Sequence, residues 1–365
     1  MQRVGAPARR DAVRNRRNGG KRRQLAAFLA VSVTAAPVSS DFQACAADAA
    51  SVPAHHTTRL ILLGTAGGPG IVRQRSEPAS LLVVDGRPYL IDAGEGVSRQ
   101  IVLAGFQIAQ VHTIFITHHH VDHNAGLEPL ISLDWFGMSL APQAPAPVQI
   151  YGPPATEHLV NAALDYLSVS ERIFRAGIPD MRPAKGMFEA HDVSENGVVY
   201  TDDLVKVAAA ENTHFSHKSM AADSGQDRSY AYRFDTPGGS VVFTGDTGPS
   251  DAVVKLAKGA DVLVSEIRAG GPPQPVTVST TAPSAPPNPP PPSPVTRELM
   301  DHILTEHLTP DEVGKIASHA RVKLVVLTHI SPSTETDMTR FTAGVKRYFS
   351  GPVVGGADFF EYDLD

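Results

Sequence analysis

Thr-His-His-His-Val-Asp-His-Asn-Ala-Gly, residues 117–126, places four potential metal ligands within six residues. These ligands, at the spacing H-x-H-x-D-H, are His118, His120, Asp122 and His123. An apolar run ends at Ile116, so the chain is predicted to leave a buried strand as it reaches them. Alternation sends the first two histidines to one side of an extended segment, and a tight turn lets the other two residues face a second centre. The stretch predicts two metal ions, because a random surface histidine tract has neither the strand nor an aspartate at this register.

Three later segments also place a histidine or an aspartate just beyond a predicted strand. His214 follows the strand predicted at 205–209, Asp246 follows that at 240–243, and His329 follows that at 323–327. We therefore expect the metal-binding side chains to lie at strand ends, along one edge of the sheets.

Short apolar and β-branched runs predict two groups of strands, each accompanied by helices. In the first half, strands are predicted at 59–63, 80–84, 88–91 and 113–116, with helices at 96–103 and 155–174. Residues 177–189 contain two prolines and are predicted to form a loop. In the second half, strands are predicted at 205–209, 231–234, 240–243, 262–264 and 323–327, with helices at 250–258 and 310–320. Two strand-rich halves imply a sheet-on-sheet core covered outside by helices.

The N-terminus is predicted to be an export signal (residues 1–46) followed by a linker (47–58). Nine basic residues against one acidic residue precede an apolar segment from Leu25 that is too short to span a bilayer, and Ala44-Cys45-Ala46 is a small-residue cleavage pattern. The pair Arg22-Arg23 favours a twin-arginine signal, which exports folded and metal-loaded protein. A general secretory signal and an uncleaved membrane anchor are the alternatives. The predicted location is the periplasm or the exterior of a bacterial cell.

Composition narrows the ligands and partners of the mature chain. The only cysteine, Cys45, lies in the predicted signal, which excludes disulfides and Cys-ligated zinc from the mature protein. Without residues 1–46 the chain keeps 23 basic and 36 acidic residues, a net charge of −13, which disfavours nucleic acid as a partner. We predict a small-molecule partner and no stable membrane association after signal cleavage, and leave a homodimer open.

The predicted folded domain, residues 59–365, contains one unusual segment. Residues 270–294 are mostly Pro, Gly and Ala and include the polyproline run Pro289–Pro292. Such a segment cannot pack a core and is predicted to be a disordered insertion. The segment begins shortly after Glu266 and ends before His307.

Several motifs resemble the metallo-β-lactamase fold superfamily and, within it, the ribonuclease Z branch. The order H-x-H-x-D-H, His, Asp, His is similar to that of the superfamily. Similarity to the branch rests on Leu63–Gly68, Leu90–Gly96, His307-Leu308-Thr309 and Leu327-Thr328-His329. The resemblance covers most of residues 59–135 and 205–330. It implies an α/β fold, the four-layer αββα sandwich, and a metal-dependent hydrolase.

The resemblance also implies a division of the ligands between two metals. His118, His120 and His214 would hold one metal, Asp122, His123 and His329 the other, and Asp246 would bridge both. Imidazoles and carboxylates suit two Zn²⁺ ions, with Mn²⁺ or Fe as alternatives. A water shared by two cations roughly 3.5 to 4 Å apart becomes a hydroxide that attacks the electrophile. Asp122 is therefore predicted to serve the catalytic centre as well as the metals. For His214 the competitor is His217, and the distance from the preceding strand favours His214.

His307 and Glu266 are predicted to be catalytic. In the family that the chain resembles, the histidine at the position of His307 assists the leaving group, and Glu266 matches its acidic partner. Helix capping around Leu308–Asp311 is another explanation of this stretch and is compatible with the first. Asp92 is interpreted either as a hydrogen-bond acceptor that orients ligands or as a turn residue. The remaining histidines are interpreted as surface or packing residues: His55, His56, His112, His119, His158, His191, His302 and His319.

Together these features predict an exported dinuclear hydrolase that acts on a phosphodiester or related ester. One alternative is a tRNA 3′-end processing endonuclease, although the basic protrusion expected between 151 and 200 for that activity is not evident in the sequence. Lactone, sulfate-ester or β-lactam hydrolysis is a second alternative. A non-catalytic zinc-binding protein on the same scaffold is a third.

Overall fold

The computed structural model describes residues 56–216, 227–269 and 294–364. The predicted signal, His55, His217 and nearly all of the Pro-rich segment lie outside this part of the chain. Within it, no helix is both long enough and apolar enough to cross a membrane.

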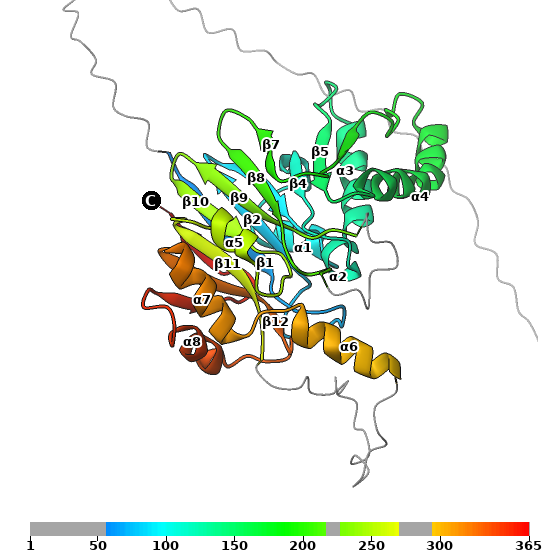
Figure 1. Cartoon of the computed structure of the whole chain (residues 1–365). Coiled ribbons are helices and arrows are strands. Elements are labelled where there is room, and N and C mark those ends of the chain that lie inside the picture. The colour runs from blue at the N-terminus through cyan, green and yellow to red at the C-terminus, as the bar shows by residue number, and fades with distance from the viewer. Residues whose placement is uncertain (1–55, 217–226, 270–293, 365) are drawn as a thin grey trace, which may run out of the picture. The chain divides into compact units, whose positions relative to one another are not determined.

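Two mixed sheets of seven strands each form the centre of the fold (Figure 1). In spatial order, the first contains β14 (Glu361–Asp363), β1 (Thr58–Gly64), β2 (Ala79–Val84), β3 (Arg87–Ile91), β4 (Thr113–Phe115), β5 (Val148–Gly152) and β6 (Phe188–Asp192). The second contains β13 (Val353–Gly355), β12 (Leu324–Ser331), β11 (Val262–Arg268), β10 (Gly239–Phe243), β9 (Tyr230–Thr236), β8 (Lys206–Glu211) and β7 (Gly197–Thr201). The strands from β3 to β6 are parallel, as are those from β10 to β13.

The sheets pack against each other through a core to which both contribute. Alternation along β1 sends Leu60 and Leu62 into this core, while Ile61 and Leu63 join a second core on the outer face. Phe115 lies at the centre, with its ring 5.4 Å from that of Tyr151 and 5.1 Å from that of Phe234. Strands buried on both faces explain the nearly continuous apolar runs of the sequence.

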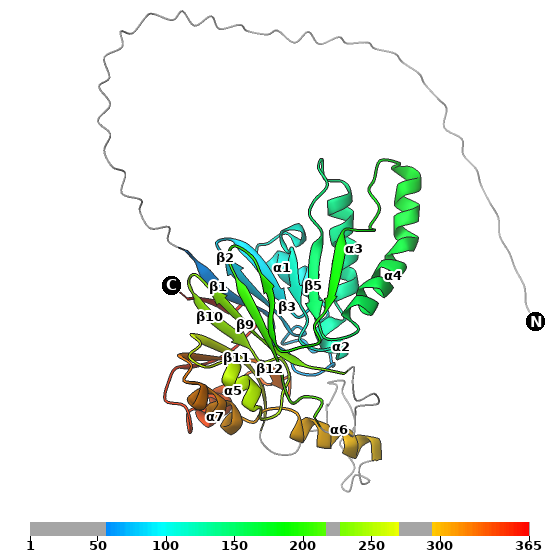
Figure 2. The same ribbon diagram turned by 45° about the horizontal axis from the view of Figure 1, so that its top comes forward.

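Helices cover the outer face of each sheet (Figures 1 and 2). Apolar side chains of α1 (Val97–Leu103), α3 (Leu127–Ser139) and α4 (Thr156–Gly177) pack on the first sheet. Those of α5 (Asp251–Leu256), α7 (Pro310–Ala320) and α8 (Thr339–Val345) pack on the second. The short elements α2 (Val121–Asn124) and η1 (Ile108–Gln110), together with α6 (Pro294–Thr305), complete the helices of the described residues. The predicted αββα sandwich is confirmed.

Several elements differ from the sequence prediction. Strands β5, β6 and β7 and helices α3, α6 and α8 were not predicted, and the predicted loop at 177–189 runs into β6 at Phe188. Strand β7 is half-exposed to exposed along its whole length, so it lacks the apolar run that marks a buried strand. Strands β11 and β12 also continue four residues beyond their predicted ends. Pairing with a neighbouring strand, which local sequence does not reveal, extends these strands.

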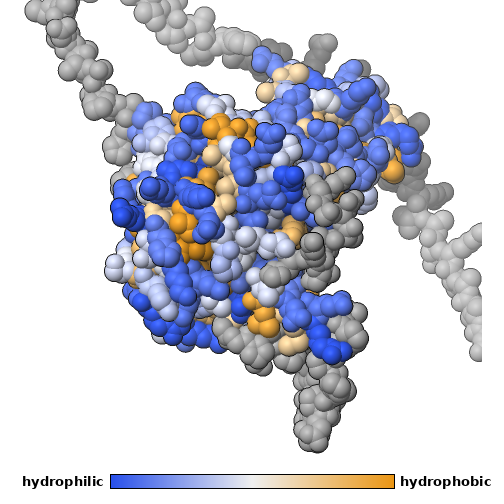
Figure 3. Space-filling model, in the orientation of Figure 1, coloured by the Kyte–Doolittle hydropathy of each residue, from blue (hydrophilic) through white to orange (hydrophobic). Residues whose placement is uncertain are grey.

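The face of the molecule seen in Figure 3 is mainly hydrophilic and carries small separate apolar areas. Helix α4 exposes the apolar side chains of Tyr166, Val169 and Ile173. The homodimer left open by the sequence stays a prediction.

A buried carboxylate in α3 is expected to lower the stability of the fold at neutral pH. Asp134 is 4% exposed, its Oδ1 has no hydrogen-bond partner among the described residues, and burial raises its pKa from 3.8 to about 6. Because the folded state favours the neutral form, stability falls as pH rises from about 4 to 6 and stays lower above that range. At about 1.4 kcal/mol per pKa unit, Asp134→Asn should raise the free energy of unfolding at pH 8 by about 1 to 3 kcal/mol.

Urea unfolding at pH 8 and pH 4 measures this effect. The gain should shrink at pH 4, where Asp134 itself is neutral in the fold. Asp165→Asn, an exposed position on α4, is the matched control and should change neither value. An equal gain at both pH values would show that the substitution acts through packing rather than charge.

Candidate metal centre

The ligand-bearing segments meet at one edge because their strands point the same way. In the second sheet, β8 and β10 are both antiparallel to β9, and β10 to β12 are parallel, so the carboxyl ends of β8, β10 and β12 share an edge. His214 follows β8 and Asp246 follows β10, whereas His329 lies within β12. His118 and His120 follow β4 of the facing sheet, and Asp122 and His123 lie on α2. All seven residues predicted as metal ligands are brought together here.

The first group of potential ligands consists of three imidazoles and one carboxylate. One ligand atom from each of His118, His120, His214 and Asp246 lies within 4.8 Å of the others. The His120 Nδ1 atom is 3.1 Å from His214 Nε2, and His118 Nε2 is 3.8 Å from Asp246 Oδ2. This is the set assigned to the first metal, with Asp246 beside it.

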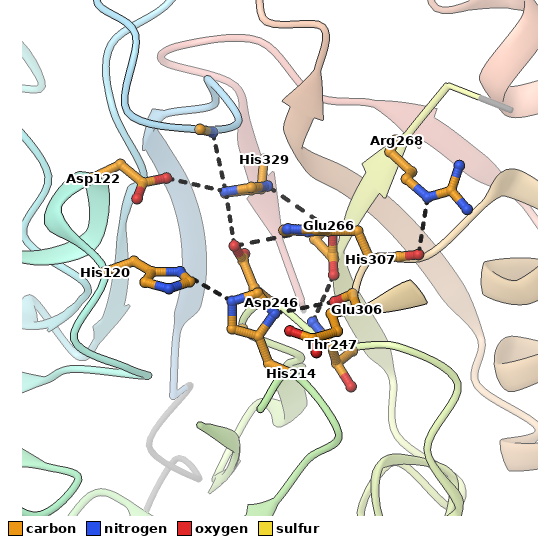
Figure 4. A network of polar contacts seen from close by, with 12 residues as sticks. His120, Asp122, His214, Asp246, Thr247, Glu266, Arg268, Glu306, His307 and His329 are labelled. Carbon is orange, nitrogen blue, oxygen red and sulfur yellow. Dashed lines mark hydrogen bonds and ion pairs between the residues drawn. The ribbon is translucent and has the colours of Figure 1, made fainter. Parts of the chain in front are cut away.

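The second group contains two imidazoles and two carboxylates. It comprises Asp122, His123, Asp246 and His329, again with ligand atoms within 4.8 Å of one another. His329 Nε2 lies 3.1 Å from Asp246 Oδ2 and 3.3 Å from Asp122 Oδ2 (Figure 4). His123 Nε2 lies 3.4 Å from Asp246 Oδ1. Asp246 is therefore the one side chain common to both groups.

These residues fit divalent cations. His118 Nε2, His123 Nε2 and Asp246 Oδ1 are buried and have no hydrogen-bond partner among the described residues. Buried polar atoms without a partner are costly, and each of these three atoms is a good ligand for a cation. The donor set holds imidazoles and carboxylates only, which suits Zn²⁺ and also Mn²⁺ or Fe.

Burial and neighbouring charges shift the pKa values of the histidines in two opposite directions. Burial lowers the pKa of His118 and His214 well below its ordinary value and that of His120 to about 4, so these rings are neutral and can ligate. Burial also opposes protonation of His329, but the Asp246 and Asp122 carboxylates outweigh it and raise the pKa to about 10. A cation bound in the second group would take the place of such protons, because a metal and a proton compete for the same lone pair.

Asp92 orients ligands through hydrogen bonds. Its Oδ2 atom lies 2.9 Å from His123 Nδ1, and its Oδ1 accepts from the Thr117 amide at 2.7 Å. The first bond fixes the ring so that Nε2 of His123 faces Asp246. Asp92 has a φ of 60°, in the left-handed region, so it also turns the chain after β3. The structure thus shows both the hydrogen bond to a candidate ligand and the turn between which the sequence left the choice open.

Backbone geometry places the shared aspartate and the last histidine. Gly245, directly before Asp246, has a φ of 57°, and a Cβ there would lie 2.9 Å from Thr117 Cβ and 3.0 Å from the Tyr230 carbonyl oxygen. Only glycine fits this turn. His329 has a φ of 42° and lies at an irregularity where Glu266 pairs with Thr328 and Ile267 with Ile330. The prediction that His329 follows a strand is wrong, because a β-bulge within β12 turns this side chain into the site.

Glu266 and His307 form a hydrogen-bonded pair beside the shared aspartate. His307 Nδ1 lies 2.8 Å from Glu266 Oε2 and 3.8 Å from Asp246 Oδ2. Glu266 also accepts the Thr247 amide at Oε1, at 2.6 Å. Burial lowers the pKa of His307, but the Glu266 carboxylate outweighs it and raises the pKa overall. Glu266 lies within β11 rather than after it, because that strand is longer than predicted.

The segment after His307 also caps a helix, as the sequence suggested. Thr309 is the N-cap of α7, and its side chain and that of Glu312 form a reciprocal capping box. The Arg268 Nε donates to the His307 carbonyl oxygen at 3.1 Å. Capping and anchoring therefore hold the backbone on either side of the His307 ring.

Three buried residues near the site were missed by sequence reasoning. His302 was interpreted as a surface or packing residue, yet its ring centroid lies 5.1 Å from that of His214 and 5.6 Å from that of His120. Its ion-pair partner is Glu306, four residues on and directly after the last residue of α6, and that spacing was the available signal. Glu77 is 5% exposed, and burial together with the Asp122 carboxylate raises its pKa to about 7.

Comparison with known proteins agrees with this geometry. The model of the beta-lactamase superfamily domain matches residues 87–330. Ribonuclease Z of Mycobacterium sp. strain KMS is 31% identical over 280 residues, which covers 76% of this chain and 86% of that protein. Ribonuclease Z of Mycobacterium avium strain 104 is 28% identical over 307 residues, which covers 83% and 97%.

A solved structure agrees as well, for the fold alone. The metallo-beta-lactamase fold protein YhfI from Bacillus subtilis matches with a TM-score of 0.60 at 17% identity, over 84% of this chain and 99% of that one. The chain is thus a metal-dependent hydrolase of the beta-lactamase superfamily and belongs to its ribonuclease Z-like branch.

Proposed function

We propose that this chain is a dinuclear phosphodiesterase with ribonuclease Z activity, cleaving precursor tRNA at its 3′ end. Relatives named ribonuclease Z support the proposal, since the chain covers 86% of one that is 31% identical and 97% of another that is 28% identical. This reverses the order of the two hypotheses drawn from the sequence. We also propose Zn²⁺ as the metal, with Mn²⁺ and Fe as alternatives that elemental analysis would distinguish.

The observation that carries the proposal is the Glu266–His307 pair beside Asp246. When a phosphodiester is cleaved, its leaving group departs as an alkoxide, and this alkoxide needs a proton as the P–O bond breaks. The Glu266 side chain is 1% exposed and that of His307 is 12% exposed, so the pair meets substrate through the imidazole. Because Nδ1 is held by Glu266, Nε2 is the atom that can deliver a proton to the leaving oxygen.

The other roles follow from the two ligand groups. When bound, two divalent cations polarise the phosphoryl group and acidify an attacking water. We assign the first cation to His118, His120 and His214, and the second to Asp122, His123 and His329, with Asp246 between them. Asp122 also adds negative charge to the second group, which offsets the charge of a cation there. Asp92 keeps His123 in the ligating orientation through the 2.9 Å bond to its Nδ1.

A second candidate is an exported hydrolase of a small phosphodiester. It is favoured because basic residues in the region that should grasp tRNA are engaged in contacts within the protein. Arg175 is paired with Glu171 at 3.1 Å, and Arg182 donates to the Pro142 carbonyl oxygen at 3.2 Å. These two guanidinium groups bind other groups of the protein. Arg172 and Lys185 are exposed and remain available to contact a phosphate backbone. The predicted signal and the charge of −13 point the same way.

A substrate comparison tests both candidates. Metal-loaded protein is incubated with precursor tRNA carrying a 3′ trailer, with a nitrophenyl phosphodiester and with an alkyl phosphodiester. We expect one endonucleolytic cut at the trailer, weakening as salt rises, because a polyanion is bound electrostatically. Turnover of the small diesters without cleavage of tRNA would replace the first candidate by the second. Rapid turnover of a lactone, sulfate ester or β-lactam, with no diester cleaved, would reject both.

A further inference from the structure

Phe215, directly after the candidate ligand His214, lies against all three imidazoles of the first ligand group. Its ring centroid is 5.8 Å from that of His118, 5.1 Å from that of His120 and 4.8 Å from that of His214. The interplanar angles with His118 and His120 are 64° and 85°, the edge-to-face arrangement that aromatic pairs prefer. Phe215 is half-buried and belongs to none of the hydrophobic cores formed by the described residues, so core packing does not account for its position.

The turn that carries Phe215 is fixed by hydrogen bonds on both sides of this residue. The Asn212 Oδ1 atom accepts from the His214 amide at 3.0 Å. The Ser216 amide and hydroxyl both donate to the Thr213 carbonyl oxygen, at 3.1 and 2.8 Å. Because the backbone is held before and after Phe215, the fold of the chain itself places the ring beside the three imidazoles.

The three imidazoles differ in what else orients them. In metal sites, the ring nitrogen that does not bind the metal is commonly held by a hydrogen bond. The His118 Nδ1 atom lies 3.1 Å from the Thr117 hydroxyl, and the His214 Nδ1 atom lies 3.1 Å from the Glu306 carbonyl oxygen. Within the described residues, the side chain of His120 is hydrogen-bonded only to His214 Nε2, which is itself a candidate ligand (Figure 4). A cation between these two nitrogens would replace that bond, so packing against other rings is what remains to orient His120.

Two rings outside the first ligand group contact that of His120. The ring centroid of Phe215 lies 5.1 Å away and that of His302 lies 5.6 Å away, so Phe215 is the nearer. We propose that Phe215 is a positioning residue whose ring holds His120 in the orientation that binds the first cation. The inference rests on the proposed assignment of that cation to the three histidines and does not depend on the identity of the substrate.

The physical basis of this role is restriction of the His120 ring before the cation binds. His120 is half-buried, so a ring without Phe215 beside it would be free to turn about its side-chain bonds and would be more open to water. Restricting a side chain in its bound conformation removes an entropic cost from the binding step. The apolar groups around a metal site also limit the access of water to it. Loss of the Phe215 ring should therefore weaken the first cation in particular.

Withdrawal of Zn²⁺ from the loaded protein by a chelator of known affinity tests the inference. Phe215→Ala should raise the Kd of one of the two Zn²⁺ equivalents about 10- to 100-fold, the range typical for loss of a group that orients a metal ligand, and leave the other unchanged. Phe215→Leu keeps apolar volume but has no ring edge, so it should weaken the same equivalent, and it carries the test if the alanine variant does not fold. Phe215→Tyr keeps the ring and should hold both equivalents as tightly as wild type.

A double-mutant cycle with His120 separates positioning from general support of the fold. Because Phe215 is proposed to act through His120, Phe215→Ala should change the Zn²⁺ affinities of a His120→Ala protein by about twofold at most. Phe136→Ala removes a phenylalanine that is 40% exposed on α3. It is the matched control and should leave both affinities unchanged.

Unchanged Zn²⁺ affinities in both Phe215→Ala and Phe215→Leu would overturn the inference, as would an equal loss with and without the His120 ring. A wild-type protein that binds fewer than two equivalents would overturn it together with the ligand assignment. If one equivalent depends on Phe215 through His120 but no phosphodiester is cleaved, the proposed activity fails and the role of Phe215 stands. Cleavage of a diester by a protein whose Zn²⁺ affinities are independent of Phe215 is the reverse case.

Discussion

Asp246→Ala is expected to lower the metal content from two equivalents to fewer than one and kcat/KM by about 10³-fold or more. Asp246 is the side chain common to both ligand groups, with oxygens 3.1 Å from His329 Nε2 and 3.4 Å from His123 Nε2. Removing it takes a ligand from each group and the carboxylate that offsets repulsion between two cations. Metal ions supply several kcal/mol of transition-state stabilisation, and each 1.4 kcal/mol corresponds to a factor of ten in rate.

Elemental analysis of purified protein and steady-state kinetics measure the two effects of this substitution. Asp246→Asn keeps the shape of the side chain and removes its charge, so it should retain more metal than the alanine variant but less than wild type. His319→Ala, on the exposed side of α7, should change neither value. An Asp246→Ala protein that keeps two equivalents of metal would disprove the shared role.

His307→Ala is expected to leave both metals bound while lowering kcat by about 10²- to 10⁴-fold, the usual range for general acid–base assistance. The ring is held by Glu266 at 2.8 Å and is assigned to the leaving group rather than to the metals. The loss should therefore depend on the substrate. A nitrophenyl diester needs little protonation as its aryl oxide departs, whereas an alkyl or nucleoside diester needs a full proton.

Comparing the two kinds of diester separates proton transfer from other roles. His307→Ala should cost a much smaller factor on the nitrophenyl diester than on the alkyl diester. Glu266→Gln should show the same pattern more weakly, because it keeps a hydrogen-bond partner for the ring but loses its charge. An equal loss on both substrates would mean that His307 positions the substrate or the fold and donates no proton.

Much of the centre could be predicted because its signals are local. His118, His120, Asp122 and His123 lie within six residues behind an apolar strand, so neither their chemistry nor their approximate placement needs distant information. The same is true of the helix from Pro310, which begins at a capping box between Thr309 and Glu312. Strands buried on both faces were recognisable from continuous apolar runs, and these established the sandwich.

The remaining features depended on contacts between distant parts of the chain. That His329 occupies a bulge follows from its pairing with β11, in which Glu266 and Ile267 skip one residue of β12. His302 resembled an ordinary helix histidine until α6 brought it 5.1 Å from His214, 88 residues earlier in the sequence. Periodicity reports which face of an element is buried, but not what that face meets. The ligand motif and the layers could thus be inferred from the sequence, whereas the convergence of two imidazole–carboxylate pairs on one metal centre required the register and packing of the folded sheets.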